Sequence, residues 1–321
     1  MFPDFIKPVA SKFTTFFNRI YVSRCARYLQ PVMLQRLADV EAMNKDPNGR
    51  PALPNDLITW LVEDSLHRGE PRKGLENLLI GRLFMANFAA IETTTMAITS
   101  TLFDILSSSP AKKFAETLRE EALNMLKASD GQPKKEDLLR MVRTDSSMKE
   151  TLRLHAIFKA LAREVTAPKG VTMENGLHLP KGSRVCISSH GLHNDESIYP
   201  NATTYDAFRY SRVLEQPAEN GTESPKHLSQ SLAATSEVYL PFGHGKHSCP
   251  GRFFAADEMK LVFAYIFSKY EIMPIEEKRS DLAIGFFPTP AFNGPIKIRR
   301  RPETVPSKVG QTSLLGKQYQ L

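Results

Sequence analysis

A proline-free helical pattern from about residue 73 to residue 109 is the feature that most constrains the fold of this chain. The pattern is longer than an ordinary globular helix, which indicates one central helix that crosses a whole domain. Breaks rich in proline, asparagine and glycine precede it at Asp46–Pro54 and at Gly69–Gly74. Shorter helical patterns follow over residues 110–128 and 135–154, so helices dominate the first half of the chain.

The second half of the chain changes character. Short strands with turn residues, notably Asn175-Gly176 and Pro180-Lys181-Gly182, are predicted over residues 165–185. A polar segment over residues 215–237 predicts a loop, and residues 301–321 predict a loose C-terminal tail. The sequence therefore predicts an α+β fold that is mostly α, with small β segments.

Composition narrows the class of protein. The chain has 321 residues, 41% of them hydrophobic and 24% charged, which is typical of a soluble globular protein. The net charge is +7, but acidic residues are mixed with the basic ones, so we expect no nucleic-acid partner. A basic surface for an acidic protein, or simple solubility, explains this charge better. The three cysteines, Cys25, Cys186 and Cys249, are scattered, which argues against a disulfide framework and favours a reducing compartment.

The N-terminal segment is aromatic and basic. Its large side chains include Phe13, Phe16, Phe17, Ile20 and Tyr21. No stretch reaches about eighteen uninterrupted apolar residues, and no signal-peptide pattern is present, so no membrane-spanning helix is predicted. Two interpretations remain: the segment lies on a membrane surface, or it is the apolar face of a helix that packs in the core.

Cys249 has the most specific setting of the three cysteines. It lies in the segment 240–255, where glycines and a proline fix a tight loop, and the apolar run after Gly251 predicts a helix that begins there. A helix N-terminus and inward N–H donors favour a thiolate over a thiol. Such a sulfur can be a nucleophile, a zinc ligand or the axial ligand of haem iron, and a buried structural cysteine is the plain alternative.

Several competing motifs fit this loop poorly. A phosphate-binding loop would need Gly at Leu240 and Ser or Thr at His247, and a dinucleotide-binding loop would need Gly at Ser248. A zinc site built from His244, His247 and Cys249 lacks a convincing fourth ligand nearby.

A family signature matches the loop instead. The spacing of the loop residues resembles the signature F-x-x-G-x-[RH]-x-C-x-G-x-x-x-A of the cytochrome P450 family, the haem-thiolate monooxygenases. The matching residues are Phe242, Gly245, His247, Cys249, Gly251 and Ala255. The resemblance implies that Cys249 is the axial ligand of the iron of haem b. It also implies that Phe242, Gly245, His247 and Gly251 belong to the cofactor-binding loop. It covers a partial domain over residues 1–300, with the tail over residues 301–321 outside it.

The long helix carries a second constellation, an acid and three hydroxyls in the segment 89–95. A carboxylate buried in an apolar helix is expensive unless it has partners or a function. The segment resembles the family's distal-helix motif, small-small-x-[DE]-T, which implies that Glu92 and Thr93 deliver protons during oxygen activation. The alternative is a solvated Glu92 beside threonines on the helix surface.

Glu150 and Arg153 form the third motif, because two residues three apart are neighbours on one helix face. The segment Asp206-Ala207-Phe208-Arg209 resembles the family's P-E-R-F segment, which implies that Arg209 completes a structural network with Glu150 and Arg153. Arg163, just before the first predicted strand, takes the place where the family holds a haem propionate, and His247 takes the other such place.

The resemblance also implies partners and location. Members of the family receive electrons from NADPH through a flavoprotein reductase, and Lys246 and Arg252 are the basic residues expected to steer its docking. The expected location is the cytoplasmic face of the endoplasmic reticulum membrane, with peripheral contact through the N-terminal aromatic segment. The segment 88–94 resembles fungal secondary-metabolism members, which points to a hydrophobic substrate such as a terpenoid or an indole-diterpene.

The front of the chain departs from the family pattern. A membrane anchor, the first sheet strands and the helix whose Trp and Arg grip a propionate are not found, and residues 1–39 resemble the loop between two roof helices and the second of those helices. We therefore expect an N-terminally truncated chain. Two other functions remain as alternatives: an inactive remnant, and a haem-thiolate isomerase, which would not need the hydroxyl of Thr93.

Overall fold

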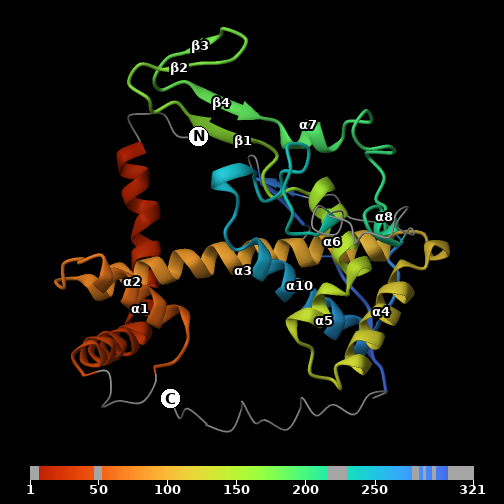
Figure 1. Cartoon of the computed structure of the whole chain (residues 1–321), viewed down its shortest axis with the longest axis horizontal. Helices are drawn as coiled ribbons and strands as arrows, with labels where there is room; N and C mark the ends of the chain where they lie inside the picture. Colours follow the sequence, from red (N-terminus) through yellow and green to blue (C-terminus); the bar gives the residue numbers. More distant parts are fainter. Residues whose placement is uncertain are drawn as a thin grey trace. The chain divides into compact units, whose positions relative to one another are not determined.

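The long helix predicted from the sequence is present as α3, Leu75–Ser107 (Figure 1). The computed structural model describes residues 7–46, 53–215, 230–276, 282–284, 287–290 and 294–302. The chain divides into two units, residues 1–91 and residues 92–321, and α3 belongs to both. Most of the predicted loop over residues 215–237 and nearly all of the predicted tail lie outside the described residues.

The first unit is built from α1, α2 and the beginning of α3. Helix α1 spans Lys7–Lys45 and α2 spans Leu57–His67. Asp56 caps α2, because its side chain accepts a hydrogen bond from the backbone N–H of Thr59 at 2.9 Å. The buried core of this unit comprises Met33, Leu37, Val40, Val62, Leu75, Leu79, Ile80 and Leu83.

The segment expected to hold a loop followed by a helix, residues 1–39, is helical from Lys7 onward, and residues 1–6 lie outside the described residues. The reason is visible in the spacing of Phe13, Phe16, Phe17 and Ile20, which recurs at three and four residues as in a helix. Phe16 and Ile20 are exposed, so these two side chains do not belong to the core of their own unit.

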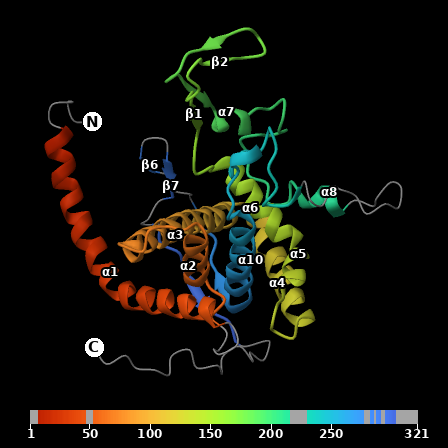
Figure 2. The same ribbon diagram turned by 60° about the vertical axis from the view of Figure 1, so that its left-hand side comes forward.

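The second unit contains the remaining helices. They are η1 (Pro110–Lys112), α4 (Phe114–Ala128), α5 (Lys135–Leu139), α6 (Val142–Leu154), α7 (Ser189–His193), α8 (Ser211–Glu215), η2 (Gly245–His247) and α10 (Arg252–Lys269). Helix α10 packs against α4, α5 and α6, as Figure 2 shows. The buried core of this unit comprises Ala97, Ile105, Phe114, Leu118, Met148, Leu152, Ala207, Leu232, Ala233, Ala256, Met259, Phe263 and Phe267.

A buried carboxylate joins α3 to α6 inside this unit. Asp104 of α3 accepts a hydrogen bond from Thr151 Oγ1 at 2.8 Å, and its other oxygen lies 3.2 Å from His155 Nε2. Asp104 is 4% exposed, so these partners offset much of the cost of removing the carboxylate from water.

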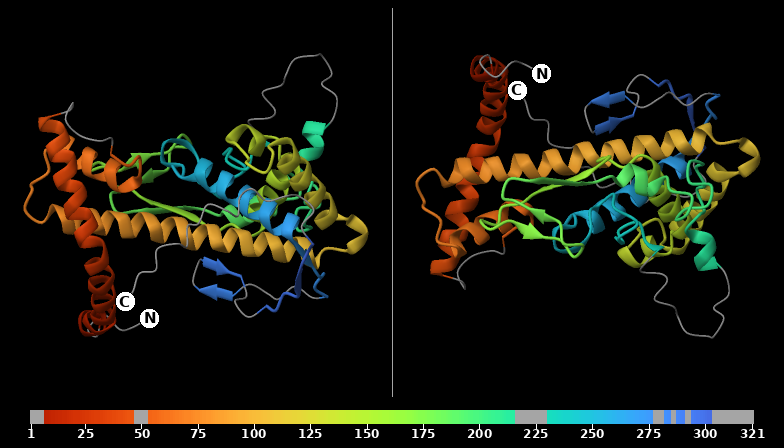
Figure 3. Two further views of the ribbon diagram at one scale, coloured as in Figure 1. Left: turned by 90° about the horizontal axis from the view of Figure 1, so that it is seen from below. Right: turned by 90° about the horizontal axis from the view of Figure 1, so that it is seen from above.

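Strands are short and form two-stranded antiparallel sheets in the described parts of the chain (Figure 3). The pairs are β1 (Leu161–Glu164) with β4 (Arg184–Ile187), β2 (Val171–Thr172) with β3 (His178–Leu179), β5 (Tyr270–Ile272) with β8 (Ile298–Arg300), and β6 (Leu282–Ile284) with β7 (Phe287–Thr289). The first strand begins four residues earlier than expected, so Arg163 lies within β1, opposite Val185, and not before it. The segment Leu161–Glu164 has no β-branched residue, and pairing with β4 supplies the strand that propensity does not indicate.

One helix predicted from the sequence is divided into two in the structure. The pattern over residues 135–154 is divided at Arg140 and Met141 into α5 and α6, although neither residue is a glycine or a proline. The backbone N–H groups of Arg143 and Thr144, at the start of α6, donate to the Glu121 carboxylate of α4 at 2.8 Å each. A helix N-terminus capped by another helix cannot be recognised from local sequence.

None of the helices in the described part of the chain combines the length and the apolar character that crossing a membrane requires.

Candidate functional site

The cysteine loop, residues 240–251, runs from the buried Leu240 to the start of α10. Cys249 lies two residues before Gly251, the N-cap of α10, and its side chain is exposed. The backbone N–H of Cys249 donates to the carbonyl of Phe242 at 2.7 Å, which closes the loop. No described residue donates a hydrogen bond to the sulfur, so the inward N–H donors expected from the sequence are not aimed at Sγ here.

Two glycines give the loop its shape. Gly243 and Gly245 have φ values of 68° and 72°, a left-handed conformation that residues with a Cβ adopt at a cost. Gly251 has no such requirement, because its φ is −82° and a Cβ there would meet the sulfur of Cys249 at 4.0 Å, an ordinary van der Waals contact. Glycine at positions 243 and 245 therefore permits the tight turn.

The side chains of Phe242 and Arg252 fasten the loop at its two ends. Phe242 is half-buried and packs against the core of the second unit. Arg252 donates from Nη1 to the carbonyl of Cys249 at 2.8 Å and from Nε to the carbonyl of Ala233 at 3.1 Å. The sequence indicated Arg252 only as a docking residue, whereas the structure gives its guanidinium a role in holding the loop. The side chain of Lys246 is exposed.

Glu150, Arg153 and Arg209 come together as a buried network. Glu150 and Arg153 have fully buried side chains, and the guanidinium binds both carboxylate oxygens at 2.7 and 2.8 Å. Arg209 Nε donates to the same carboxylate at 2.9 Å. Burial alone would lower the pKa of Arg153, but the hydrogen bonds and charge of Glu150 raise it above its usual value. The bidentate geometry is the one that Arg and a carboxylate favour, and it fixes both side chains.

The two arginines of the network also bind backbone carbonyls from distant segments. Arg153 Nη1 donates to the carbonyls of His193 and Ala202, the latter at 2.7 Å. Arg209 Nη1 donates to the carbonyl of Pro200 at 2.8 Å. The network therefore holds the chain that leads from α7 to α8 against α6.

The other predicted site residues are accessible. Glu92 is exposed and Thr93 is half-buried in α3, so the carboxylate carries no burial penalty of the kind expected from the sequence. His247 is exposed in η2. Arg163 is exposed on β1, and its Nη1 donates to the carbonyl of Ala162 at 2.9 Å.

The candidate ligand residues near Cys249 fit a haem-thiolate site better than a zinc site. Within the described ranges, no three His, Cys, Asp or Glu side chains gather as ligands of one metal ion. A haem-thiolate site requires one cysteine sulfur that the cofactor can reach, and the thiol of Cys249 is exposed.

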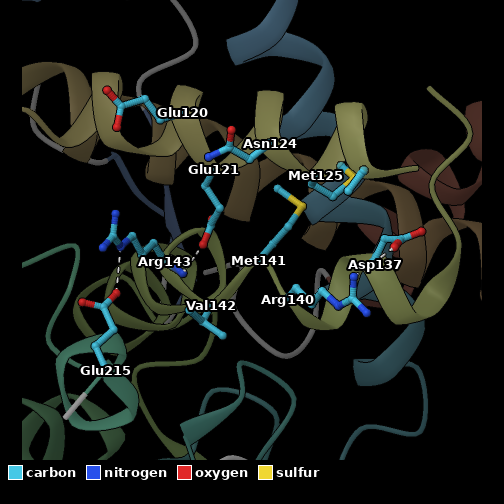
Figure 4. A pocket seen from close by; sticks show the side chains of 11 residues that line it. Glu120, Glu121, Asn124, Met125, Asp137, Arg140, Met141, Val142, Arg143 and Glu215 are labelled. Atoms are coloured by element: carbon cyan, nitrogen blue, oxygen red, sulfur yellow. Dashed lines mark hydrogen bonds and ion pairs between the residues drawn. The ribbon is translucent and has the colours of Figure 1, made fainter. Parts of the chain in front are cut away.

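A cavity of about 400 Å³ lies elsewhere, between α4, α5, α6 and α8, and none of the predicted site residues lines it (Figure 4). Glu121 points to the N-terminus of α6, where it binds the backbone of Arg143 and Thr144, and Arg143 pairs with Glu215 at 2.7 Å. Burial raises the pKa of Glu121, although the hydrogen bonds from α6 oppose this. These contacts stabilise the helix that carries Glu150.

Sequence reasoning missed the buried residues that surround the network. His193 is fully buried and accepts a hydrogen bond from the backbone N–H of Leu240 at 3.0 Å. Lys149 lies over the rings of Tyr210 and Tyr239, with its Nζ 4.7 Å from each centroid, and burial lowers its pKa to about 8. A single histidine or lysine in a turn-rich or polar sequence gives no signal of such burial.

Comparison with known proteins agrees with the geometry. The family description "Cytochrome P450" matches residues 1–287. The chain is 38% identical to cytochrome P450 monooxygenase gloO of Glarea lozoyensis and 37% identical to cytochrome P450 monooxygenase ecdH of Aspergillus rugulosus, in each case over 94% of this chain and 56% of the relative. A third relative, cytochrome P450 monooxygenase htyF of Aspergillus rugulosus, is 34% identical over 92% of this chain and 44% of its own length.

The chain thus spans about half the length of these curated relatives. The match nevertheless includes the long helix, the buried Glu150 network and the cysteine loop, in this order. The family match extends over far more than half of the residues, and on this ground the chain belongs to the cytochrome P450 family.

Proposed function

We propose that this protein is a haem-thiolate monooxygenase that oxidises a hydrophobic small molecule in fungal secondary metabolism. The observation that carries the proposal is the exposed thiol of Cys249 at the end of a loop fastened by Phe242 and Arg252. The fungal relatives gloO and ecdH are named cytochrome P450 monooxygenases, which supports the proposed activity.

In this proposal Cys249 would bind the iron of haem b through its sulfur, and the cysteine loop would hold that residue in place. Phe242 would supply an apolar contact, Gly245 lets the backbone turn at a positive φ, and Gly251 would leave room for the cofactor because it has no side chain. Arg163 and His247 are accessible cations or donors for the carboxylates of the cofactor. Bound haem supplies the redox-active iron that activates oxygen, and the thiolate favours O–O cleavage by donating electron density.

Glu92 and Thr93 supply protons in this proposal. The exposed carboxylate of Glu92 can exchange protons with water, and the adjacent Thr93 hydroxyl can pass a proton on from Oγ1. The presence of this hydroxyl favours a monooxygenase over an isomerase that rearranges peroxides, because such an isomerase needs no external proton supply.

The proposed electron donor is an NADPH-dependent cytochrome P450 reductase, for which the exposed Lys246 offers a cation beside the cysteine loop. The proposed location is the cytoplasmic face of the endoplasmic reticulum membrane. Exposed apolar side chains on α1, among them Phe16, Tyr21 and Val22, support peripheral contact with lipid. The proposed substrate is a terpenoid or an indole-diterpene, on the analogy of the segment 88–94 alone.

The test is a comparison of cysteine variants in the reduced carbon-monoxide complex. The protein should show the red-shifted Soret band of thiolate ligation, and Cys249→Ser should abolish it. Cys186→Ser is the matched control, because Cys186 is also exposed but lies on β4. Retention of the band in Cys249→Ser, or its loss in Cys186→Ser, would refute the ligand assignment. Incubation of the wild-type protein with reductase, NADPH and candidate substrates then tests the substrate class by product formation.

A further inference from the structure

His193 makes a hydrogen bond that the assigned roles do not include. Its side chain is fully buried at the end of α7, and Nε2 lies 3.0 Å from the backbone nitrogen of Leu240. A backbone N–H can only donate, so Nε2 must be unprotonated and Nδ1 must carry the ring proton. Leu240 is the first residue of the cysteine loop, and it is buried as well.

The backbone of the same histidine belongs to the Glu150 network. Its carbonyl accepts a hydrogen bond from Arg153 Nη1, and that arginine is held by both oxygens of Glu150. One residue therefore contacts the network through its backbone and the cysteine loop through its ring.

We propose that His193 is a positioning residue that ties the Glu150–Arg153–Arg209 network to the start of the cysteine loop. The path to the sulfur is short. The Leu240 carbonyl accepts the N–H of Gly243 at 2.9 Å, and the Phe242 carbonyl accepts the N–H of Cys249 at 2.7 Å. A displacement of Leu240 is therefore transmitted to the residue that carries the thiol. The inference rests on the proposed haem-thiolate function, since its value lies in the setting of that thiol.

The surroundings of His193 favour a fixed and neutral ring. The ring stacks on Tyr239 with centroids 5.9 Å apart and an interplanar angle of 30°. Burial lowers the pKa of His193 to about 4. The contact of the ring with the backbone of Arg153 opposes this shift, whereas the charges of Arg153 and His190 act in the same direction as burial. Across the neutral pH range, Nε2 is therefore available as an acceptor.

Two further hydrogen bonds hold the segment that enters the loop. Tyr199 Oη donates to the carbonyl of Val238 at 2.7 Å, and Tyr239 Oη donates to the carbonyl of Lys149 at 3.2 Å. Neither bond involves the backbone N–H of Leu240, which donates to His193. A purely space-filling role for the ring would be met by any apolar side chain of similar size, whereas the positioning role requires an acceptor at the place of Nε2.

The experiment compares His193→Leu, which removes the acceptor, with His193→Gln, whose side-chain oxygen can reach the place of Nε2. His190→Leu is the control, because His190 lies on the same short helix but is exposed. Two properties of each protein are measured: the hydrogen-exchange rate of the Leu240 amide, and the fraction of the reduced carbon-monoxide complex with the thiolate-type Soret band.

We expect His193→Leu to exchange the Leu240 amide about tenfold faster, since a buried hydrogen bond is lost, and to convert part of the thiolate-type band to the protonated-thiol type. His193→Gln and His190→Leu should remain close to the wild type in both properties. Unchanged Leu240 exchange in His193→Leu, or equal damage in His193→Gln, would overturn the proposal.

If His193→Leu does not fold, the wild-type protein still decides the question. Nitrogen-15 spectra of the His193 ring should show Nε2 without a proton, and a protonated Nε2 would overturn the proposal. Failure of the proposed function has a different signature, because retention of the thiolate-type band in Cys249→Ser would refute the ligand while leaving the Leu240 exchange unaffected.

Discussion

Acidification should destabilise this protein through His193 before most of its carboxylates are protonated. The pKa of the ring falls from 6.5 to about 4 on folding, because burial disfavours the charged form. Well above pH 6.5 the ring is neutral in both states and contributes no pH dependence. As the pH falls below 6.5, the unfolded chain binds a proton that the folded protein excludes, so the free energy of unfolding decreases. The loss from pH 7 to pH 5 is about 2 kcal/mol, and it reaches about 3 kcal/mol below pH 4.

The assay is urea unfolding of the wild-type protein and of His193→Gln at several pH values from 7 to 5. Glutamine does not titrate, so the variant retains the pH dependence of every other group and lacks only that of His193. The wild type should lose about 2 kcal/mol more than the variant over this range. Parallel pH profiles for the two proteins would refute the reasoning, because they would mean that the ring is not held neutral.

Three further outcomes follow from the site. Arg153→Leu should lower the free energy of unfolding by about 3–5 kcal/mol in urea titrations, because it removes the fully buried partner of the Glu150 carboxylate. Arg209→Leu should lower it less, since Arg209 is 15% exposed and Glu150 keeps both bonds to Arg153, and equal losses would contradict this order. Thr93→Ala should retain haem but release peroxide in place of product when reductant is consumed, and unchanged coupling would remove Thr93 from the proton path. Lys246→Glu should slow reduction by the reductase most at low salt, because charges on the surface are screened beyond about 8–10 Å at physiological ionic strength. A reduction rate that responds neither to the charge reversal nor to salt would exclude docking through this face.

The elements that depend on local sequence could be predicted closely. The expected helix over residues 73–109 is α3, Leu75–Ser107, and the helix expected after Gly251 begins at Arg252. Both have strong local signals, a long uninterrupted pattern in one case and a glycine boundary in the other. The three residues expected to form a network, Glu150, Arg153 and Arg209, lie together as the family resemblance implied.

Features that depend on distant contacts could not be predicted. The break between α5 and α6 depends on Glu121, which lies on a different helix. The strand at Leu161–Glu164 exists because it pairs with β4. The role of Arg252 also belongs to this group, since the carbonyl of Ala233 that it binds is 19 residues away. In each case the deciding partner is outside the window over which periodicity and capping signals act.

The buried Asp104 has a consequence for the angular setting of α3. Successive residues of an α-helix are rotated by about 100°, so Thr93, eleven residues earlier, lies within about 20° of Asp104 around the axis, while Glu92 lies about 120° away. The contacts of Asp104 with Thr151 and His155 fix which side of α3 faces α6 at this level. They therefore also fix the direction of Thr93, about 16 Å along the axis, and a rotation of the helix by a single residue position would bring Glu92 or Thr94 to that side in its place.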